Sequence, residues 1–464
     1  MILKRRPILL ALAAVLAATQ AAGAADKHFN RIASFAVPDN MAEGEDRTRE
    51  TAPEIIAASG DGMTLVYTDS PLGAIGRIDI SDPANPQPLG NIVMDGEPTA
   101  VSVLGNMAYV GVNTSVSYSE PSGELRTVDL ASGEILASCP LDGQPDSVAS
   151  AAAPDGRFVA VAIENERDEE AGDGRVPQMP GGSVALVEIN AEGLVNCDSL
   201  LYADVTGLAE IAPEDPEPEF VDINTLGETV VTVQENNHLV VLDYAGKVVA
   251  DFSAGTVDLD GIDASDDGAL IFNEQQAKRL REPDALQWID NDHFAIANEG
   301  DMDGGARGWT IFSKRGEVVY ESGTSFERAV IEAGHYPDKR SDAKGSEPEG
   351  MEFAVFEGTP YVFLLSERGS LVGVYDVSNL AEPQLTQLLP SGLSPEGAVA
   401  IPSRGLLATA NEGDLGEDGG PRAHVMIYQY QDAPAVYPTL TSAGADELIG
   451  WGALSGLVAA DDML

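Results

Sequence analysis

Three acidic loop sequences have the residue types that hold a divalent cation. Residues 298–305 read NEGDMDGG, residues 164–170 read ENERDEE and residues 411–418 read NEGDLGED. Oxygen-bearing side chains on alternate residues, with glycines for tight turns, are typical of calcium loops. None of the three has the full EF-hand spacing, and an acidic turn whose side chains cap backbone N–H groups is the alternative for each.

We predict calcium as the metal on this set of acids, because its preference for hard oxygen ligands suits carboxylates. A bound calcium ion would hold a substrate phosphate and activate a water molecule for its hydrolysis. The predicted metal ligands come from the loops above and from neighbouring repeats: Glu164, Glu299, Asp301, Asp303, Glu349, Glu367, Glu412 and Asp414.

Basic residues are few, so those near these acids are candidates for binding an anion. Residues 334–345 read GHYPDKRSDAKG and lead into the acidic stretch 347–350, while Arg281 lies in a neighbouring loop. Arginine is a bidentate partner for phosphate, and a loop histidine can act in acid–base catalysis. Pairing of these cations with the surrounding acids is the alternative. The predicted catalytic residues are His335, Arg340, Lys344 and Arg281.

A repeat of seven segments must position these side chains. Each segment has a turn with proline and usually an acid, an apolar strand, a short turn, and a second strand that ends in an acid or amide. The segments begin at Pro53, Pro98, Pro145, Pro218, Pro283, Pro348 and Pro395. A second strand pair follows each segment, and no amphipathic helical stretch of any length is present. This pattern predicts an all-β, seven-bladed β-propeller, with an open solenoid as the alternative.

Propeller geometry places the loop before the first strand and the loop after the second on one face. We therefore expect twelve acids at one mouth of the channel, and we expect residues 29–37 to supply the outer strand of the last blade. So many carboxylates cannot all stay ionised together without cations, hydrogen bonds or raised pKa values. The acids are Glu54, Asp69, Asp146, Glu164, Glu219, Glu235, Asp284, Glu299, Glu349, Glu367, Glu396 and Glu412.

The formal net charge of −50 argues against nucleic acid or anionic lipid as a partner and favours cations. A uniformly solvated acidic shell, adapted to a salty habitat, is the alternative explanation of the charge. No P-loop, Rossmann glycine fingerprint, zinc helix or nucleophile elbow is present in the sequence.

The first residues have the pattern of an export signal. Lys4, Arg5 and Arg6 precede an apolar stretch at 8–18 and a small-residue cleavage site at 22–24. We predict a signal peptide over residues 1–24 and a location in the periplasm or outside the cell. A membrane anchor is the alternative, although the apolar run is shorter than the about 20 residues that a spanning helix needs. Cys139 and Cys197 fall at similar points of neighbouring repeats, so both a disulfide and two free thiols remain open.

Several longer motifs resemble the bacterial choice-of-anchor I propellers, and specifically exported proteins named for esterase-like activity of the phytase family. The motifs are residues 143–149 (GQPDSVA), 162–169 (AIENERDE), 215–219 (DPEPE), 234–238 (QENNH), 281–285 (REPDA), 297–301 (ANEGD) and the stretch 334–350. The resemblance implies a YVTN- and WD40-like propeller of the type seen in quinoprotein amine dehydrogenase β-chains and in calcium-dependent phytases. It supplies no residue-level catalytic scheme.

Members of this family often continue into a second, phytase-like domain that begins with a strand of sequence WGALSGL. Residues 451–457 have this sequence. We therefore assign residues 25–438 to the propeller and residues 439–464 to the start of a truncated second domain or a disordered tail, and we expect that segment to pack poorly.

Two functions follow from the sequence. The first is a calcium-dependent phosphoesterase that acts on a small phosphate ester, or binds another anionic ligand through the metal, at the acidic mouth. The second is a non-catalytic periplasmic or cell-surface propeller that binds a ligand or partner on the same face, since the fold serves both uses. The sequence leaves the oligomeric state open.

Overall fold

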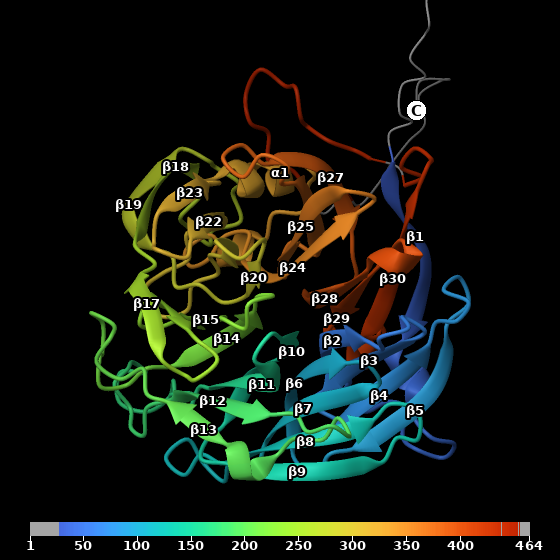
Figure 1. Cartoon of the computed structure of the whole chain (residues 1–464). Coiled ribbons are helices and arrows are strands. Elements are labelled where there is room, and N and C mark those ends of the chain that lie inside the picture. Colours follow the sequence, from blue (N-terminus) through green and yellow to red (C-terminus); the bar gives the residue numbers. More distant parts are fainter. Residues whose placement is uncertain (1–26, 438, 453, 455–464) are drawn as a thin grey trace, which may run out of the picture.

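Seven four-stranded antiparallel sheets surround a central channel in the computed structural model, as the blades of a propeller (Figure 1). The structure describes residues 27–437, 439–452 and 454. The predicted signal peptide lies outside the described residues. The all-β, seven-bladed propeller predicted from the repeat is confirmed.

Blades 1 to 3 are each built from four consecutive strands, and the first strand of each lies innermost. The strands are β2 (Pro53–Ala58), β3 (Thr64–Asp69), β4 (Ala74–Asp79) and β5 (Gln87–Val93) in blade 1; β6 (Glu97–Leu104), β7 (Met107–Asn113), β8 (Gly123–Asp129) and β9 (Ile135–Leu141) in blade 2; and β10 (Pro145–Ala153), β11 (Gly156–Ile163), β12 (Ser183–Glu188) and β13 (Leu201–Ala203) in blade 3.

Blades 4 to 6 follow the same plan. Their strands are β14 (Pro218–Ile223), β15 (Thr229–Val233), β16 (His238–Leu242) and β17 (Val248–Ser253) in blade 4; β20 (Leu286–Trp288), β21 (His293–Ala297), β22 (Trp309–Ser313) and β23 (Val318–Glu321) in blade 5; and β24 (Pro348–Phe356), β25 (Thr359–Ser366), β26 (Leu371–Asp376) and β27 (Gln384–Pro390) in blade 6.

Blade 7 joins the two ends of the propeller. It contains β28 (Pro395–Ile401), β29 (Leu406–Asn411) and β30 (His424–Gln431), and its outer strand is β1 (His28–Ala36). β1 pairs with β30 from His28 opposite Gln431 to Ala36 opposite His424. Phe29 packs against the rings of Phe356 and Phe363 in blade 6, at 5.0 and 5.2 Å between ring centroids. The expectation that residues 29–37 supply this outer strand is confirmed.

A β-bulge follows the proline that begins the inner strand. Pro53 is opposite Asp69 and the next pair is Ile56 with Tyr67, so the inner strand carries one residue more than its partner. The same irregularity follows Pro145, Pro218, Pro348 and Pro395. Proline is tolerated at a strand's first residue, and a bulge re-aims the neighbouring side chains. The bulge thus includes the acid that follows the proline.

The hydrophobic core lies between adjacent blades and is formed mainly by the three inner strands. Every residue of β15 and β16 is buried, whereas β17 alternates between exposed and partly buried residues. Where blade 7 meets blade 1, Phe35 of blade 7 and Tyr67 of blade 1 belong to one buried hydrophobic cluster. Burial on both faces explains the continuous apolar runs of these strands.

A disulfide joins the outer edges of blades 2 and 3. Cys139 of β9 is bonded to Cys197 in the short helix η2 (Cys197–Ser199), and their Cα atoms are 5.4 Å apart. Of the two alternatives left open by the sequence, the disulfide is the one observed.

Insertions between strands were not predicted. The hairpin of β18 (Thr256–Ile262) and β19 (Glu274–Leu280) precedes blade 5, and α1 (Ser325–Glu332) precedes blade 6. At eight residues, α1 is too short for its apolar periodicity to stand out in the sequence. The remaining elements are single turns: η1 (Val37–Asn40), η3 (Asp338–Arg340), η4 (Pro402–Arg404) and η5 (Gly416–Asp418).

The described part of the segment after residue 438 forms neither helix nor strand, and most of it is exposed. Two contacts hold it against the end of α1: the carbonyl of Glu332 accepts hydrogen bonds from the Ser442 N–H (2.9 Å) and the Trp451 indole (3.1 Å). The expected poor packing thus describes most of the segment but not Trp451. Within the described residues, no helix is long and apolar enough to cross a membrane.

Candidate functional site: the acidic mouth of the channel

Six carboxyl side chains, one from each blade except blade 2, lie at one level of the channel. We call this set the carboxyl ring: Glu54, Asp146, Glu219, Asp284, Glu349 and Glu396, each directly after the proline that precedes or begins the inner strand. Thr99 occupies the corresponding place in blade 2. Five of the six acids and Thr99 line a cavity of about 80 Å³. The bulge after the proline places these groups at the centre of the molecule.

The side chains of the carboxyl ring are partly exposed to the channel but have few water molecules' worth of space around them, and this environment favours the protonated forms. Burial, with the neighbouring carboxylates, raises the pKa of Glu54 to about 8, and the same two causes raise the pKa of Asp146 to about 7. Burial also raises the pKa values of Glu219, Asp284, Glu349 and Glu396 well above the ordinary carboxyl range. The ring therefore holds protons at neutral pH unless a cation enters.

A second set of acids, the outer acids, stands at the ends of the second strands: Asp69, Glu164, Glu235, Glu299, Glu367 and Glu412. Each acts electrostatically on the ring acid of its own blade, as Glu164 does on Asp146 and Glu412 on Glu396. The twelve acids expected at one mouth are thus brought together by six blades.

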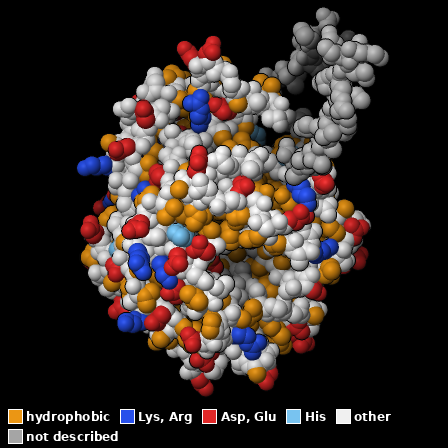
Figure 2. Space-filling model, turned by 45° about the horizontal axis from the view of Figure 1, so that its top comes forward, with side chains coloured by type: hydrophobic (Ala, Val, Ile, Leu, Met, Phe, Trp, Pro, Cys, Tyr) orange, Lys and Arg blue, Asp and Glu red, His pale blue; other side chains and the backbone are white. Residues whose placement is uncertain are grey.

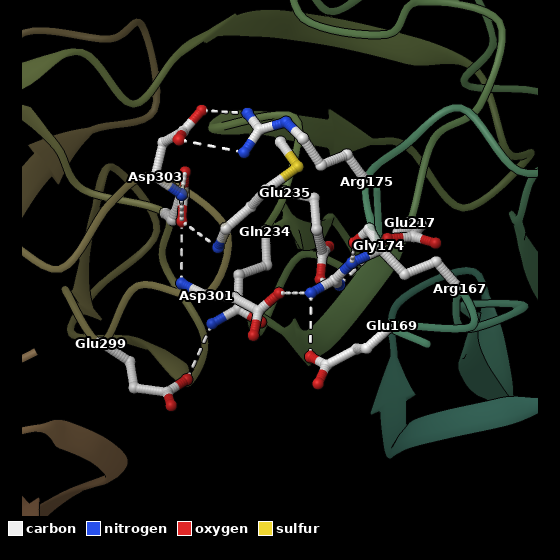
Figure 3. Close-up of polar contacts among 12 residues, drawn as sticks. Arg167, Glu169, Gly174, Arg175, Glu217, Gln234, Glu235, Glu299, Asp301 and Asp303 are labelled. Atoms are coloured by element: carbon white, nitrogen blue, oxygen red, sulfur yellow. Dashed lines mark hydrogen bonds and ion pairs between the residues drawn. The ribbon is translucent and has the colours of Figure 1, made fainter. Parts of the chain in front are cut away.

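Arg167 lies among the acids of blades 3 to 5 and is only 5% exposed (Figure 3). Its Nη1 is 2.7 Å from Glu235 and 3.8 Å from Glu217, and its Nη2 pairs with Asp301. The charges of Glu235, Asp301 and Glu217 raise the pKa of the guanidinium against the opposing effect of burial. Arg167 is thus the counter-ion of three carboxylates at the mouth.

Lys344 neutralises a neighbouring part of the mouth. Its Nζ lies 2.8 Å from Glu299 and 3.9 Å from both Asp301 and Glu347. Glu299 also accepts a hydrogen bond of 2.8 Å from the Gln234 amide. Arg340 forms a two-point contact with Glu347, at 2.6 and 2.8 Å. The predicted catalytic residues Arg340 and Lys344 are therefore brought together through one shared carboxylate.

The other two predicted catalytic residues lie apart from the carboxyl ring. Arg281 is buried and its guanidinium contacts Glu321 at 2.6 Å and Thr310 at 3.0 Å in the outer half of blade 5. His335 follows α1, and its Nδ1 is 2.9 Å from the Gly369 carbonyl. Arg281, Arg340 and Lys344 all pair with surrounding acids. This is the arrangement given above as the alternative to binding an anion.

Acids of two of the three acidic loops, 298–305 and 411–418, pair with arginines. Asp301 pairs with Arg167, Asp303 pairs with Arg175, and Asp414 is 2.6 Å from Arg422. In residues 298–305 the backbone N–H groups of 301 to 303 donate to the Glu282 carboxylate at 2.7 to 2.9 Å. Throughout the described residues, no three His, Cys, Asp or Glu side chains are grouped so as to hold a metal ion.

The remaining predicted ligands belong to the two sets of mouth acids. Glu349 is a ring acid, and Glu367 pairs with Arg368 at 2.7 Å. Glu164 is 6% exposed and lies near Asp146 and Arg167, while Glu412 acts on Glu54 and Glu396. Calcium binding by these acids is not tested by the structure and stays a prediction.

Sequence reasoning assigned no role to Arg167, Glu217 or Glu282. Arg167 is the single cation in the acidic run 164–170, which is the signal that could have identified it. Glu217 and Glu282 stand beside the prolines that precede blades 4 and 5, but nothing in the local sequence shows which groups they approach. Glu217 approaches Arg167 of the loop in blade 3, whereas Glu282 accepts from the loop 298–305 within blade 5.

The fold and the mouth define a seven-bladed β-propeller whose channel opens among carboxyl groups. The chain belongs to the choice-of-anchor I domain family, whose model matches residues 54–304 and 302–380. This membership fits an exported or surface protein. No curated protein matches the chain.

Solved structures share the propeller architecture at low sequence identity. A chain of Kuenenia stuttgartiensis hydrazine synthase is 15% identical with a TM-score of 0.51, covering 84% of this chain and 98% of that one. The RRP9 WD40 repeats are 10% identical with a TM-score of 0.54, covering 86% and 99%. The Cps50 (Swd1) propeller of Myceliophteria thermophila is 10% identical with a TM-score of 0.52, covering 87% and 100%. At these identities the similarity concerns the fold alone.

Proposed function

We propose that this protein is an exported, non-catalytic propeller that binds a positively charged ligand at the acidic mouth of its channel. One observation carries the proposal: six blades each direct a ring acid and an outer acid to the same place, where burial raises the pKa values of the ring acids. A cation that enters stabilises the ionised forms of these groups and displaces their protons, so its attraction to the carboxylates must exceed the cost of ionising them in this desolvated place.

The basic side chains at the mouth support a cationic rather than an anionic ligand. Arg167, Arg340 and Lys344 are each held by carboxylates at 2.6 to 2.8 Å. An anion would have to displace those carboxylates and then lie beside them, which adds repulsion to the loss of the ion pairs. A cation need not displace these carboxylates, and it is attracted by them rather than repelled.

Asp and Glu side chains are dispersed over the face shown in Figure 2, and Lys and Arg side chains occur among them. This dispersed charge agrees with an acidic solvated shell on that face. Screening by salt weakens attraction to such a shell, whereas buried carboxyl groups are screened less. Binding that persists at 0.15 M salt therefore separates the mouth from the general surface.

Isothermal titration calorimetry with spermidine, calcium and magnesium tests the proposal, run in two buffers of different ionisation enthalpy. We expect proton release on binding and an affinity that rises between pH 5 and pH 8, because the bound cation favours the ionised carboxyls. The double variant Glu219→Gln/Glu349→Gln should lose at least tenfold in affinity. Its matched control is Glu382→Gln, which changes an exposed acid on the outer edge of blade 6.

The calcium-dependent phosphoesterase remains the competing hypothesis. It predicts phosphate release from phytate or p-nitrophenyl phosphate with calcium and none with a chelator, and such turnover would replace the binding function proposed here. Absence of cation binding at any pH between 5 and 8, or equal binding by the double variant, would overturn the proposal.

A further inference from the structure

The loop that carries Arg167 spans residues 164–182 between β11 and β12, and we call it the mouth loop. Between residues 166 and 181, Arg167 is the only buried residue. The loop includes Gly172 and Gly174 at φ values of 66° and 70°, which glycine adopts without strain. Arg167 is therefore the one buried side chain of this stretch that contacts neighbouring blades.

Besides Arg167, the mouth loop contacts neighbouring blades through Arg175, Gln178 and the Gly182 N–H, which donates to the Pro216 carbonyl at 2.7 Å. Arg175 pairs with Asp303, and these side chains are 40% and 51% exposed. The backbone N–H of Gln178 donates to Asp215. An exposed pair of this kind is weak, so it cannot by itself hold the loop closed. Figure 3 shows the two arginines of the loop pointing to acids of blades 4 and 5.

The acids beneath Arg167 depend on it for a counter-ion. Glu217 is fully buried, and neither of its oxygens accepts a hydrogen bond from an N–H or hydroxyl group. One oxygen of Glu235, which is 2% exposed, is likewise without such a donor. If Arg167 leaves, these carboxyls must be protonated or find another cation, because an unpaired buried charge is strongly unfavourable.

The contacts of Arg167 match a planar guanidinium group. Nη1 meets Glu235 and Glu217, Nη2 meets Asp301 and Glu169, and Nε donates to the Gly174 carbonyl at 3.0 Å. Glu169 and Gly174 move with the mouth loop, whereas Glu217, Glu235 and Asp301 belong to other blades. Blades 4 and 5 thus supply a carboxyl to each terminal nitrogen of Arg167. A compact ammonium ion matches this planar arrangement less well.

We propose that Glu217, Glu235 and Asp301 form a guanidinium-binding pocket that Arg167 fills in cis, and that a ligand with an alkylguanidinium group displaces Arg167 and opens the mouth loop. The inference rests on the proposed cation binding at the mouth and names the chemical group that the mouth selects. Arg167 competes with the ligand for the pocket. The apparent affinity of the wild-type protein is therefore lowered in proportion to the fraction of molecules whose mouth loop is open.

Ethylguanidinium is the probe, with ethylammonium and neutral ethylurea as comparators. In Arg167→Ala we expect ethylguanidinium to bind at least tenfold more tightly than in the wild-type protein by calorimetry, and to raise the melting temperature more than ethylammonium does. The matched control is Arg328→Ala, which removes an exposed arginine from α1 that is paired with Glu332. The control should behave as the wild-type protein. Equal effects of ethylguanidinium and ethylammonium on Arg167→Ala would overturn the pocket.

A second measurement uses the unaltered protein and covers the case in which Arg167→Ala does not fold. Saturating ethylguanidinium should speed cleavage within the mouth loop by subtilisin, a protease that does not require an arginine at the cleavage site, because the opened loop is accessible to the protease. Ethylurea should leave the cleavage rate unchanged, and an unchanged rate with ethylguanidinium would refute displacement. If wild type and variant bind no cation at all, the proposed function fails. If spermidine binds without preference for guanidinium in the variant, only the present inference fails.

Discussion

The carboxyls of Glu349 and Glu367, a ring acid and an outer acid of blade 6, lie within hydrogen-bonding reach of each other. Burial raises the pKa of Glu367 to about 7 and that of Glu349 well above its ordinary range. Two carboxyl groups at hydrogen-bonding distance cannot both ionise cheaply, as in other carboxyl pairs. Proton retention by one of the two carboxyls is thus one way in which neighbouring acids at the mouth coexist.

The stability of the protein should fall as the pH rises from about 5 to 8. The pKa values of Glu54, Glu217 and Glu367 are raised in the folded state to about 8, 8 and 7. Their contribution is fully present below the ordinary carboxyl pKa and is lost as the pH passes the raised values. Thermal unfolding at constant ionic strength should show a melting temperature several degrees lower at pH 8 than at pH 5. A melting temperature that increases over this range would contradict the raised pKa values.

Replacing Glu349 by glutamine should stabilise the protein at high pH. Glutamine has nearly the shape of the protonated carboxyl, keeps a donor for Glu367 and cannot ionise. We expect Glu349→Gln to raise the melting temperature at pH 8 and to change it little at pH 5. Glu382→Gln is the control, since this acid is exposed. Destabilisation by Glu349→Gln at pH 8 would show that the ionised carboxylate has a structural partner.

Reduction of the Cys139–Cys197 disulfide should destabilise the propeller. The bond closes a loop across blades 2 and 3 with a sequence separation of 58 residues. A cross-link of this kind contributes about 2–4 kcal/mol, mainly by restricting the unfolded chain. Urea unfolding with and without dithiothreitol measures the difference. The double variant Cys139→Ala/Cys197→Ala should match the reduced protein and should not respond to reductant.

The closure of blade 7 should depend on Phe29. This side chain is 1% exposed, and its backbone also exchanges hydrogen bonds with the Gln387 amide at 2.8 and 3.3 Å. Truncation of a buried phenylalanine costs about 3–5 kcal/mol. We expect Phe29→Ala to lower the free energy of unfolding by that amount, whereas Val93→Ala, at a site 64% exposed, should have little effect. A loss below about 1 kcal/mol would show that β1 is dispensable.

Much of the fold and the carboxyl ring could be predicted from local sequence. The pairing of proline with the following acid fixes both the start of an inner strand and the place of Glu219 or Glu349 in the channel. The partners of the loop acids could not be predicted in this way. Asp301 meets Arg167 from two blades away in the chain, and only the closed ring brings them together. Calcium binding by these loops stays a prediction, because an acidic turn has one local pattern whether a metal or an arginine neutralises it.

The strand order of blade 7 also bears on how the chain folds. β1 is the first described strand to be synthesised, yet its partner β30 is the last. Such a long-range pairing loses loop-closure entropy before its stabilising contacts can form, so it forms late. Until then Phe29 and the free edge of β30 are open to pairing with other chains. Misassembly is thus most probable before this final step of folding. A chaperone that covers unpaired β1 would act where it prevents most misassembly.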